Sequence, residues 1–440
     1  MAELTMGVDI GTTRLKAGVV DEERALIHAE ATATPWRITD EGPVVDVAEL
    51  GDVVIGIVRQ CAREVAALGH WVVGIGTTGM GETGALLDAG GEPLAPGFAW
   101  HHTLGDADAV QRALGRDRFA AVTGHGCDLA PSVIKLDYLR GMGHRFAPGQ
   151  RWLNIPEYIS YRLTGEQACE FSLSGRTGLY DLRGQCWWDD ALNLIGAGTW
   201  LLPGDPLPAG AAVGKVPSSI PEVAGAVVTT AGHDHPVAAA SVMSPVPGTL
   251  CYSLGTSEAQ LRVVTADLAE EQIRALVAIG ATVDRHPNGE AWYVLGTLPT
   301  GLTLERLAAL LGRSDTRERL ALSREAMTVE RAPGARLREV SLDGFDIVGV
   351  TSGDTPAGLW LTAVESLLAV SDGLRDEMSA VIGAPRAETV LGGWTHDPLV
   401  MRERGRRGQR ATDNSPLEPG IVGAAMAAAK ASGQVTALWQ

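Results

Sequence analysis

The sequence lacks the cationic surface and the long apolar run that would mark two broad classes of protein. Lys and Arg together number 36 against 53 Asp and Glu, which gives a net charge of −17. This acidic excess argues against nucleic acid or an anionic membrane as a partner, because both select clustered Lys and Arg. No uninterrupted apolar run reaches membrane-spanning length, and residues 1–5 lack the basic and apolar pattern of a leader. We therefore expect a soluble, cytoplasmic protein.

Cysteine is scarce and shows no pairing pattern. The five cysteines are odd in number, widely spaced and free of any Cys-x-x-Cys pair, which predicts reduced thiols rather than a disulfide framework or a zinc site. They are Cys61, Cys127, Cys169, Cys186 and Cys251.

The length and the order of the patterns favour two α/β domains. A chain of 440 residues exceeds what one hydrophobic core usually serves, and 45% hydrophobic with 20% charged residues is an ordinary globular balance. Apolar periodicity predicts a helix over residues 47–68, a buried strand over 71–76, a helix of about two dozen residues from Thr355 and Pro356, and a strand before Gly392. The Pro-rich residues 244–247 are the best linker candidate, so we divide the chain into residues 1–245 and 246–440.

Residues 6–20 form the most informative segment, because they place an acid, a glycine, two hydroxyls and a cation around one turn. Apolar residues alternate up to Asp9, and Gly11 allows a tight turn whose N–H groups can face an anion. Thr12, Thr13 and Lys16 follow, and an apolar run then resumes as a hairpin partner rather than a helix. A phosphate-binding hairpin is one interpretation, and a glycine-threonine hairpin without a ligand is the other.

The same device occurs a second time about 240 residues later. A strand over residues 249–254 runs into Gly255, Thr256 and Ser257, where the first copy has Gly-Thr-Thr. Two such turns are expected of a duplicated fold in which each half contributes one phosphate loop to a ligand between them.

Asp234 is the candidate general base. It follows Gly232 and His233 at the end of an apolar strand, where a carboxylate can accept a proton from a substrate hydroxyl. Two alternatives remain: Asp234 caps the helix that follows, or His233 and His235 bind zinc in a hydrolase, for which no further ligand has a matching spacing.

Taken in order, these motifs resemble those of the FGGY carbohydrate kinases. The resemblance covers nearly the whole chain and includes residues 9–13, Gly232 with Asp234, residues 255–257, Gly392 with Gly393, and residues 418–425, together with residues 162–166 and 177–181. It implies two ribonuclease H-like domains of the actin and hexokinase superfamily, with an interdomain cleft that closes on ATP, Mg²⁺ and a sugar or polyol. A homodimer is compatible with it.

The resemblance also implies roles for individual residues. Asp9 would hold Mg²⁺ through water, and Thr12, Thr13 and Lys16, in the turn at Gly11, would contact the β- and γ-phosphates. From the other half, Gly255 and Thr256 would cradle phosphate, and Gly392 and Gly393 would pass under the adenosine. Asp234 would be the catalytic base.

The expected substrate residues are Glu82, Trp100 and His235, and their surroundings depart from the named family members. Gly81 replaces the arginine of the Arg-Glu-Thr pattern of glycerol kinases, and His102 and Leu104 replace the Asp and Arg that usually follow the tryptophan. The prediction is therefore an ATP-dependent kinase for a small sugar, ketose or polyol of unspecified identity. The alternative is a catalytically impaired sugar or nucleotide sensor of the same fold.

Two further segments depart from the family pattern. Trp394 follows the glycine pair, where packing into the second domain is the expected role and stacking near adenine the other. Residues 402–410 form a basic run that we expect to be a solvated helix end.

Overall fold

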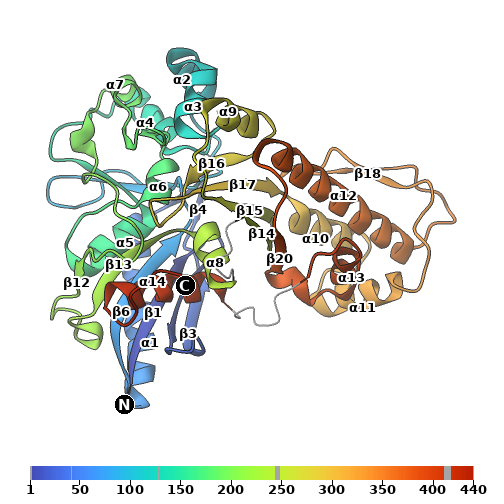
Figure 1. Ribbon diagram of the computed structural model, residues 1–440, viewed down its shortest axis with the longest axis horizontal. Helices are drawn as coiled ribbons and strands as arrows, with labels where there is room; N and C mark the ends of the chain where they lie inside the picture. The colour runs from blue at the N-terminus through green and yellow to red at the C-terminus, as the bar shows by residue number, and fades with distance from the viewer. Residues whose placement is uncertain (1, 41, 127, 243–247, 411–417, 440) are drawn as a thin grey trace.

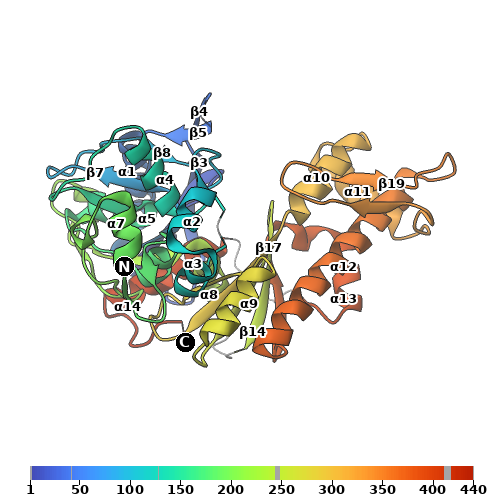
Figure 2. The same ribbon diagram turned by 90° about the horizontal axis from the view of Figure 1, so that it is seen from above.

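The computed structural model describes residues 2–40, 42–126, 128–242, 248–410 and 418–439 of the chain. Figures 1 and 2 show two lobes: one contains both termini and the first large sheet, and the other contains helices α10 to α13. A second large sheet lies between the first lobe and these helices. The candidate site residues lie at the ends of strands in these two sheets.

The first sheet has six strands in the order β12-β13-β6-β1-β2-β3. Strands β1 and β2 form the predicted antiparallel hairpin, while β6 runs parallel to β1 and β13 runs parallel to β6. The strands are β1 (Glu3–Ile10), β2 (Arg14–Val20), β3 (Leu26–Ala33), β6 (Trp71–Gly79), β12 (Gly214–Lys215) and β13 (Val227–His233). The expected strand over 71–76 is confirmed and continues to Gly79.

Helix α1 (Val47–Ala67) covers part of this sheet and forms where its periodicity predicts. Its N-cap is Asp46, whose side chain accepts hydrogen bonds from the N–H groups of Ala48 and Glu49. The other helices of this lobe are α2 (Ala107–Leu114), α3 (Arg116–Thr123), α4 (Ser132–Gly141), α5 (Ile155–Thr164), α6 (Phe171–Gly175), α7 (Asp189–Ile195) and α8 (Asp234–Val242). Short strands complete it: β4 (Arg37–Thr39), β5 (Gly42–Val45), β7 (Gly84–Leu87), β8 (Gly97–Phe98), β9 (Arg151–Asn154), β10 (Tyr180–Asp181) and β11 (Cys186–Trp187).

The second sheet repeats the topology of the first. Its order is β16-β17-β15-β14-β20; β14 and β15 form a hairpin, and β20 runs parallel to β14 as β6 does to β1. The strands are β14 (Thr249–Leu254), β15 (Glu258–Val264), β16 (Thr282–Arg285), β17 (Trp292–Leu298) and β20 (Ala387–Leu391). The expected duplication of an α/β unit is therefore confirmed.

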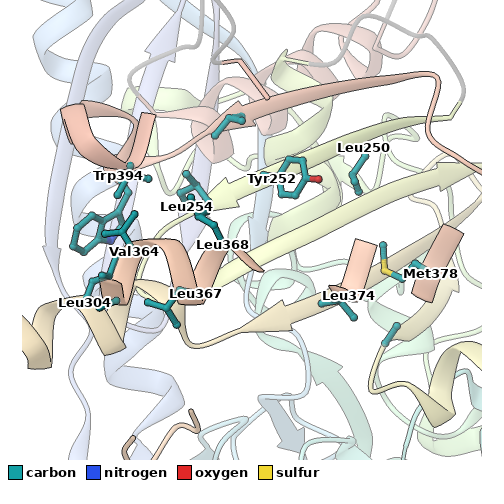
Figure 3. Packing of buried hydrophobic residues seen from close by; sticks show 14 of the residues in the cluster. Leu250, Tyr252, Leu254, Leu304, Val364, Leu367, Leu368, Leu374, Met378 and Trp394 are labelled. Carbon is teal, nitrogen blue, oxygen red and sulfur yellow. The ribbon is translucent and has the colours of Figure 1, made fainter. Parts of the chain in front are cut away.

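The second sheet packs on a large apolar core that Figure 3 shows, with Leu254, Leu304, Val364 and Trp394 close together. Trp394 is buried in this core, which is the structural role expected for it. The helices are α9 (Glu270–Ala278), α10 (Thr300–Leu310), α11 (Thr316–Ala326), α12 (Pro356–Ile382) and α13 (Pro398–Arg406), with the hairpin β18 (Arg336–Arg338) and β19 (Asp346–Val348).

Helix α12 is the predicted long helix and starts at the predicted residues. The Thr355 side chain caps it by accepting from the N–H of Gly358, and Pro356 occupies its first turn. By length and composition alone α12 could cross a membrane, a feature that the search for uninterrupted apolar runs did not anticipate. Its apolar residues instead form part of the core under the second sheet.

Helix α14 (Pro419–Ala431) returns the end of the chain to the first lobe (Figure 1). It packs on β1 and β6 at backbone distance, because a Cβ at Gly7 would lie 1.9 Å from the carbonyl oxygen of Ile421 and one at Gly76 would lie 2.0 Å from that of Ala424. Residues 419–431, which belong to the second half of the predicted division, therefore pack on the first sheet. The predicted boundary at 245 falls outside the described residues.

Two expectations about polar and sulfur side chains can be compared with the structure. Of the four described cysteines, all free, Cys186 is exposed and the others are buried, and Cys127 lies outside the described residues. The basic run is not simply a solvated helix end: Arg404 is fully buried, its guanidinium bonds Glu258 at 2.7 Å and lies 5.0 Å from the Tyr252 ring. A buried carboxylate needs such a partner, and this need overrides solvation.

Candidate functional site

The carboxyl ends of three parallel strands gather the first group of predicted residues. Asp9 on β1 is opposite Thr78 on β6, and Thr78 is in turn opposite Gly232 on β13, whose carbonyl accepts a hydrogen bond from the Thr78 hydroxyl at 2.7 Å. The turn at Gly11, the loop after β6 and the start of α8 at Asp234 therefore leave the same edge of the sheet. Chain segments more than two hundred residues apart meet there.

Asp9 carries one carboxylate oxygen without a hydrogen-bond partner in the described part of the chain. Its Oδ1 is buried and has no partner among the described residues, and its Oδ2 would lie 2.7 Å from a Cβ on Gly420 of α14. Burial raises the pKa of Asp9 to about 7; Lys16 opposes this effect, while Asp234 and Glu418 add to it. A buried oxygen without a donor, beside other acidic groups, fits a site that receives a hydrated cation. The position therefore suits the Mg²⁺ that the resemblance implies.

The first turn is held by two tryptophans. The indole N–H of Trp100 donates to the hydroxyl oxygen of Thr12 at 3.0 Å, and that of Trp36 donates to the Thr12 carbonyl at 2.6 Å. The carbonyl of Thr13 accepts from the backbone N–H of Thr34 at 3.1 Å. Trp100, expected at the wall of a sugar pocket, therefore donates a hydrogen bond to the turn at Gly11 itself.

Lys16 faces the end of the chain rather than solvent alone. Its ammonium lies 2.7 Å from Oε2 of Glu418, the residue that precedes α14, and both side chains are partly exposed. An ammonium has three N–H donors, so Lys16 can contact a further anion beside Glu418.

Asp234 begins α8 with its carboxylate 31% exposed, which leaves it accessible to a small molecule. Its Oδ1 accepts from the backbone N–H of His235 at 2.7 Å and lies 3.2 Å from His233 Nε2 and 4.0 Å from His235 Nε2. The Asp234 carboxylate thus accepts a hydrogen bond within the first turn of α8 and remains partly accessible. Burial, aided by Arg176, holds the pKa of His233 well below its usual value, so this imidazole is neutral.

The zinc alternative finds no support in the described part of the chain, which contains no group of three His, Cys, Asp or Glu side chains arranged to hold a metal. The His233 ring is instead engaged with Asp234 and with Tyr293, whose hydroxyl lies 3.2 Å from Nδ1.

Glu82 is buried and paired, not a solvated turn residue. Its backbone has a φ of 59°, a conformation that residues other than glycine rarely adopt. Its carboxylate forms an ion pair with Arg176. Gly81 leaves the space that this arginine occupies, since a Cβ there would lie 2.9 Å from Arg176 Cγ. Arg176 also lies 3.3 Å from Asp284 of the second sheet. Sequence reasoning missed both residues, although Arg176 directly precedes a quoted motif.

The second sheet gathers the remaining predicted residues at one end. The turn at Gly255 and Thr256 follows β14, and Gly392 follows the adjacent parallel strand β20. Gly392 has a φ of 102° and a Cβ there would lie 2.5 Å from the Leu254 carbonyl, so its own sheet already requires glycine, whereas Gly393 faces open space. Sequence analysis did not identify Gly301, although a Cβ there would lie 2.0 Å from the Gly255 carbonyl oxygen. The backbone N–H of the next residue, Leu302, donates to the Thr256 carbonyl.

A small cavity of about 10 Å³ lies beneath this second turn. It is bordered by Gly255, Gly301, Leu304 and Trp394, and Figure 3 shows Leu304 and Trp394 beside Val364. The turn therefore rests on a nearly filled apolar core.

Comparison with known proteins identifies the family of this chain. The model of the N-terminal domain of the FGGY family of carbohydrate kinases matches residues 4–241. An L-fuculokinase of Salmonella typhi is 27% identical over 241 residues, which cover 53% of this chain and 51% of that protein. The chain thus spans about half the length of the curated relatives it matches.

Solved structures extend the likeness of fold to the whole chain. A xylulose kinase from Rhodospirillum rubrum superimposes with a TM-score of 0.86 at 20% identity, covering 99% of this chain and 91% of that one. A Plasmodium falciparum glycerol kinase with ADP gives 0.84 at 16% identity, covering 99% and 91%. The repeated sheets are those of the two-domain actin and hexokinase-like fold, and the chain belongs to the FGGY family of carbohydrate kinases.

Proposed function

We propose that this protein transfers a phosphoryl group from ATP to a hydroxyl of a small sugar, ketose or polyol. The observation that carries the proposal is the accessible carboxylate of Asp234. Asp234 follows β13 at the same edge of the sheet where β1 ends with Asp9 and the turn at Gly11. Family membership and relatives named as L-fuculokinase and glycerol kinase support the reaction class.

The residues divide between proton transfer and phosphate binding. Asp234 accepts the proton of the attacking hydroxyl, because its carboxylate has one face engaged by the helix and another open. Asp9 holds Mg²⁺ through water, and Mg²⁺, when bound, neutralises charge on the phosphates. The phosphates contact Gly11, Thr12, Thr13 and Lys16 from one sheet and Gly255 and Thr256 from the other, while the adenosine lies over Gly392 and Gly393.

Substrate recognition is assigned to the loops around the base. Glu82 accepts a hydrogen bond from a substrate hydroxyl, and Trp100 forms one wall of the sugar pocket. His235 donates a hydrogen bond to the sugar or accepts one from it. In this scheme residues 1–245 carry the sugar pocket and residues 246–440 bind nucleotide, with α14 returning to the first sheet. The enzyme would act in the cytoplasm on small molecules, without nucleic acid or membrane partners, and a homodimer is allowed.

A direct assay tests the proposal. ADP release is followed with MgATP and a panel that includes fuculose, xylulose, glycerol, other pentuloses, hexoses and polyols. Asp234→Asn should lower kcat by about 10²- to 10⁴-fold with little change in ATP affinity. Asp189→Asn is the matched control, because Asp189 is also an exposed acid in the first turn of a helix.

Two outcomes contradict the proposal. Absence of sugar-stimulated ADP release across the panel, with tight sugar or nucleotide binding by calorimetry, would favour the sensor alternative. Wild-type turnover by Asp234→Asn would remove the assigned base.

A further inference from the structure

A buried chain of polar side chains connects the candidate substrate residue to the candidate base through the second sheet. Its members come from four separated segments and each is within contact distance of the next. In order they are Glu82, Arg176, Asp284, Tyr293, His233 and Asp234. The function proposed above uses only the two ends and leaves the four central residues unexplained.

The first arm leads from Asp284 to the substrate residue. Arg176 places one guanidinium nitrogen 3.3 Å from Asp284 Oδ2 and another against Glu82 Oε1. Arg176 and Glu82 have side chains only 10% and 5% exposed. A buried guanidinium that is shared by two carboxylates fixes the orientation of both. The direction of the Glu82 carboxylate, on a backbone of positive φ, is therefore set from the other sheet.

The second arm leads from Asp284 to the base. The Tyr293 hydroxyl lies 3.2 Å from Asp284 Oδ2 and 3.2 Å from His233 Nδ1. The Tyr293 hydroxyl donates a hydrogen bond to the Asp284 carboxylate. The hydroxyl oxygen of Tyr293 is then the acceptor for Nδ1–H of the neutral His233 imidazole. Nε2 of His233 is then an acceptor 3.2 Å from Asp234 Oδ1, able to receive a hydrogen bond once Asp234 has taken up a proton. The tautomer of His233 thus depends on Asp284.

Asp284 is held where the two arms meet by close packing between lobes. A Cβ at Gly175 of α6 would lie 1.9 Å from Asp284 Oδ1, and His125 Nε2 lies 3.3 Å from Oδ2. The side chain is fully buried, and β16 packs against the first lobe through a hydrogen bond from Val283 N–H to the Gly124 carbonyl at 2.9 Å. Arg176 and Tyr293 both donate to Oδ2, so this one oxygen anchors the two arms.

We propose that Asp284 is a positioning residue that organises both halves of the active site: through Arg176 it orients Glu82 toward the substrate, and through Tyr293 and His233 it prepares Asp234 to take up the substrate proton. This inference rests on the proposed kinase function and adds to it a residue contributed by the second sheet.

The two arms predict different kinetic signatures. Tyr293→Phe breaks the base arm and should lower kcat about 10- to 100-fold with the sugar KM nearly unchanged, the loss expected for a hydrogen bond to a charged group. Arg176→Lys breaks the substrate arm and should raise the sugar KM and weaken sugar binding by a similar factor, with a smaller effect on kcat. Asp284→Asn should do both. Combining it with Tyr293→Phe should lower kcat no further, because the two changes interrupt the same arm.

Matched controls separate positioning from stability. Tyr252→Phe removes a buried tyrosine hydroxyl, bound to Glu388 and Gln409, from the same sheet, and Arg262→Lys alters a buried arginine that binds carbonyls at the end of α12. Both should lower the melting temperature about as much as the arm variants while leaving kcat and the sugar KM unchanged.

Two results overturn the inference, and a third concerns only the proposed function. A wild-type kcat in Tyr293→Phe would show that the network is merely structural. The same conclusion would follow if kcat and sugar binding fell together in Tyr293→Phe, Arg176→Lys and Asp284→Asn and fell equally in the two control variants. Unchanged sugar affinity of Arg176→Lys, measured by calorimetry without ATP, would remove the substrate arm. A wild-type protein that binds a sugar of the panel but does not turn it over would refute the kinase proposal, while this binding measurement still decides the role of Arg176.

Discussion

Replacing Asp9 by Asn should stabilise the protein at high pH and weaken its further stabilisation by MgATP. Burial raises the pKa of Asp9 from 3.8 to about 7. At about 1.4 kcal/mol per pKa unit, a shift of this size corresponds to about 4 kcal/mol. Since the side chain as a whole is not fully buried, we expect an effect of about 2–4 kcal/mol.

The sign follows from proton linkage. The folded pKa lies above the unfolded one, so the folded state retains a proton that the unfolded state has lost, and the penalty of the buried charge is complete above about pH 7 and absent below about pH 4. Asp9→Asn, which carries no charge, should therefore melt about 2–4 °C higher than wild type at pH 8 without magnesium, and the gap should close by about pH 4.

Thermal melting across this pH range, with and without MgATP, measures the effect. MgATP at pH 8 should stabilise wild type more than Asp9→Asn, because a ligand that binds only the native state raises its melting temperature. Asp40→Asn, which changes an exposed carboxylate, is the control and should show no pH-dependent difference. An Asp9→Asn protein that is less stable than wild type at pH 8, or equally stabilised by MgATP, would refute the assignment of Asp9 as an uncompensated acid awaiting a cation.

Two further predictions concern packing and the first turn. Gly76→Ala should lower stability by about 2–3 kcal/mol, because its Cβ would lie 2.0 Å from the Ala424 carbonyl of α14. Gly56→Ala, in an exposed position of α1 with nothing within 4 Å, should instead raise stability by about 0.5–1 kcal/mol; equal melting shifts in the two variants would contradict the account of α14 packing. Trp100→Phe removes the hydrogen bond to Thr12 and should raise the KM for ATP about 3- to 10-fold. An unchanged KM would show that the bond does not shape the turn.

Local signals in the sequence were sufficient for much of the fold. The N-cap residues Asp46 and Thr355 begin helices where periodicity predicts them, because capping and amphipathic spacing act within one or two turns. The two glycine turns and their strands were also foreseen, and their repetition predicted the duplicated sheet topology. These features depend on residues near one another in the chain.

The missed features depend on residues far apart in the chain. Arg176 is separated by 94 positions from Glu82 and by 108 from Asp284, and no spacing rule relates them. The same is true of Arg404, which is 146 positions from Glu258, so its place in a basic run suggested solvent although its partner is buried. Ion pairs of this kind arise from the tertiary fold and leave no periodic trace.

The contact between Lys16 and Glu418 joins residues 402 positions apart, yet it depends on short sequence motifs as well. The glycines of β1 and β6 let α14 approach the sheet at backbone distance, and this approach brings Glu418, the residue before the helix, to Lys16 at the start of β2. The small residues of β1, β6 and α14 therefore allow an approach that places a carboxylate beside Lys16 and the backbone of Gly420 close to Asp9. If Lys16 binds a phosphate as we propose, the anion would share this ammonium with Glu418, so the proposed nucleotide site would be coupled to the contact between α14 and the first sheet.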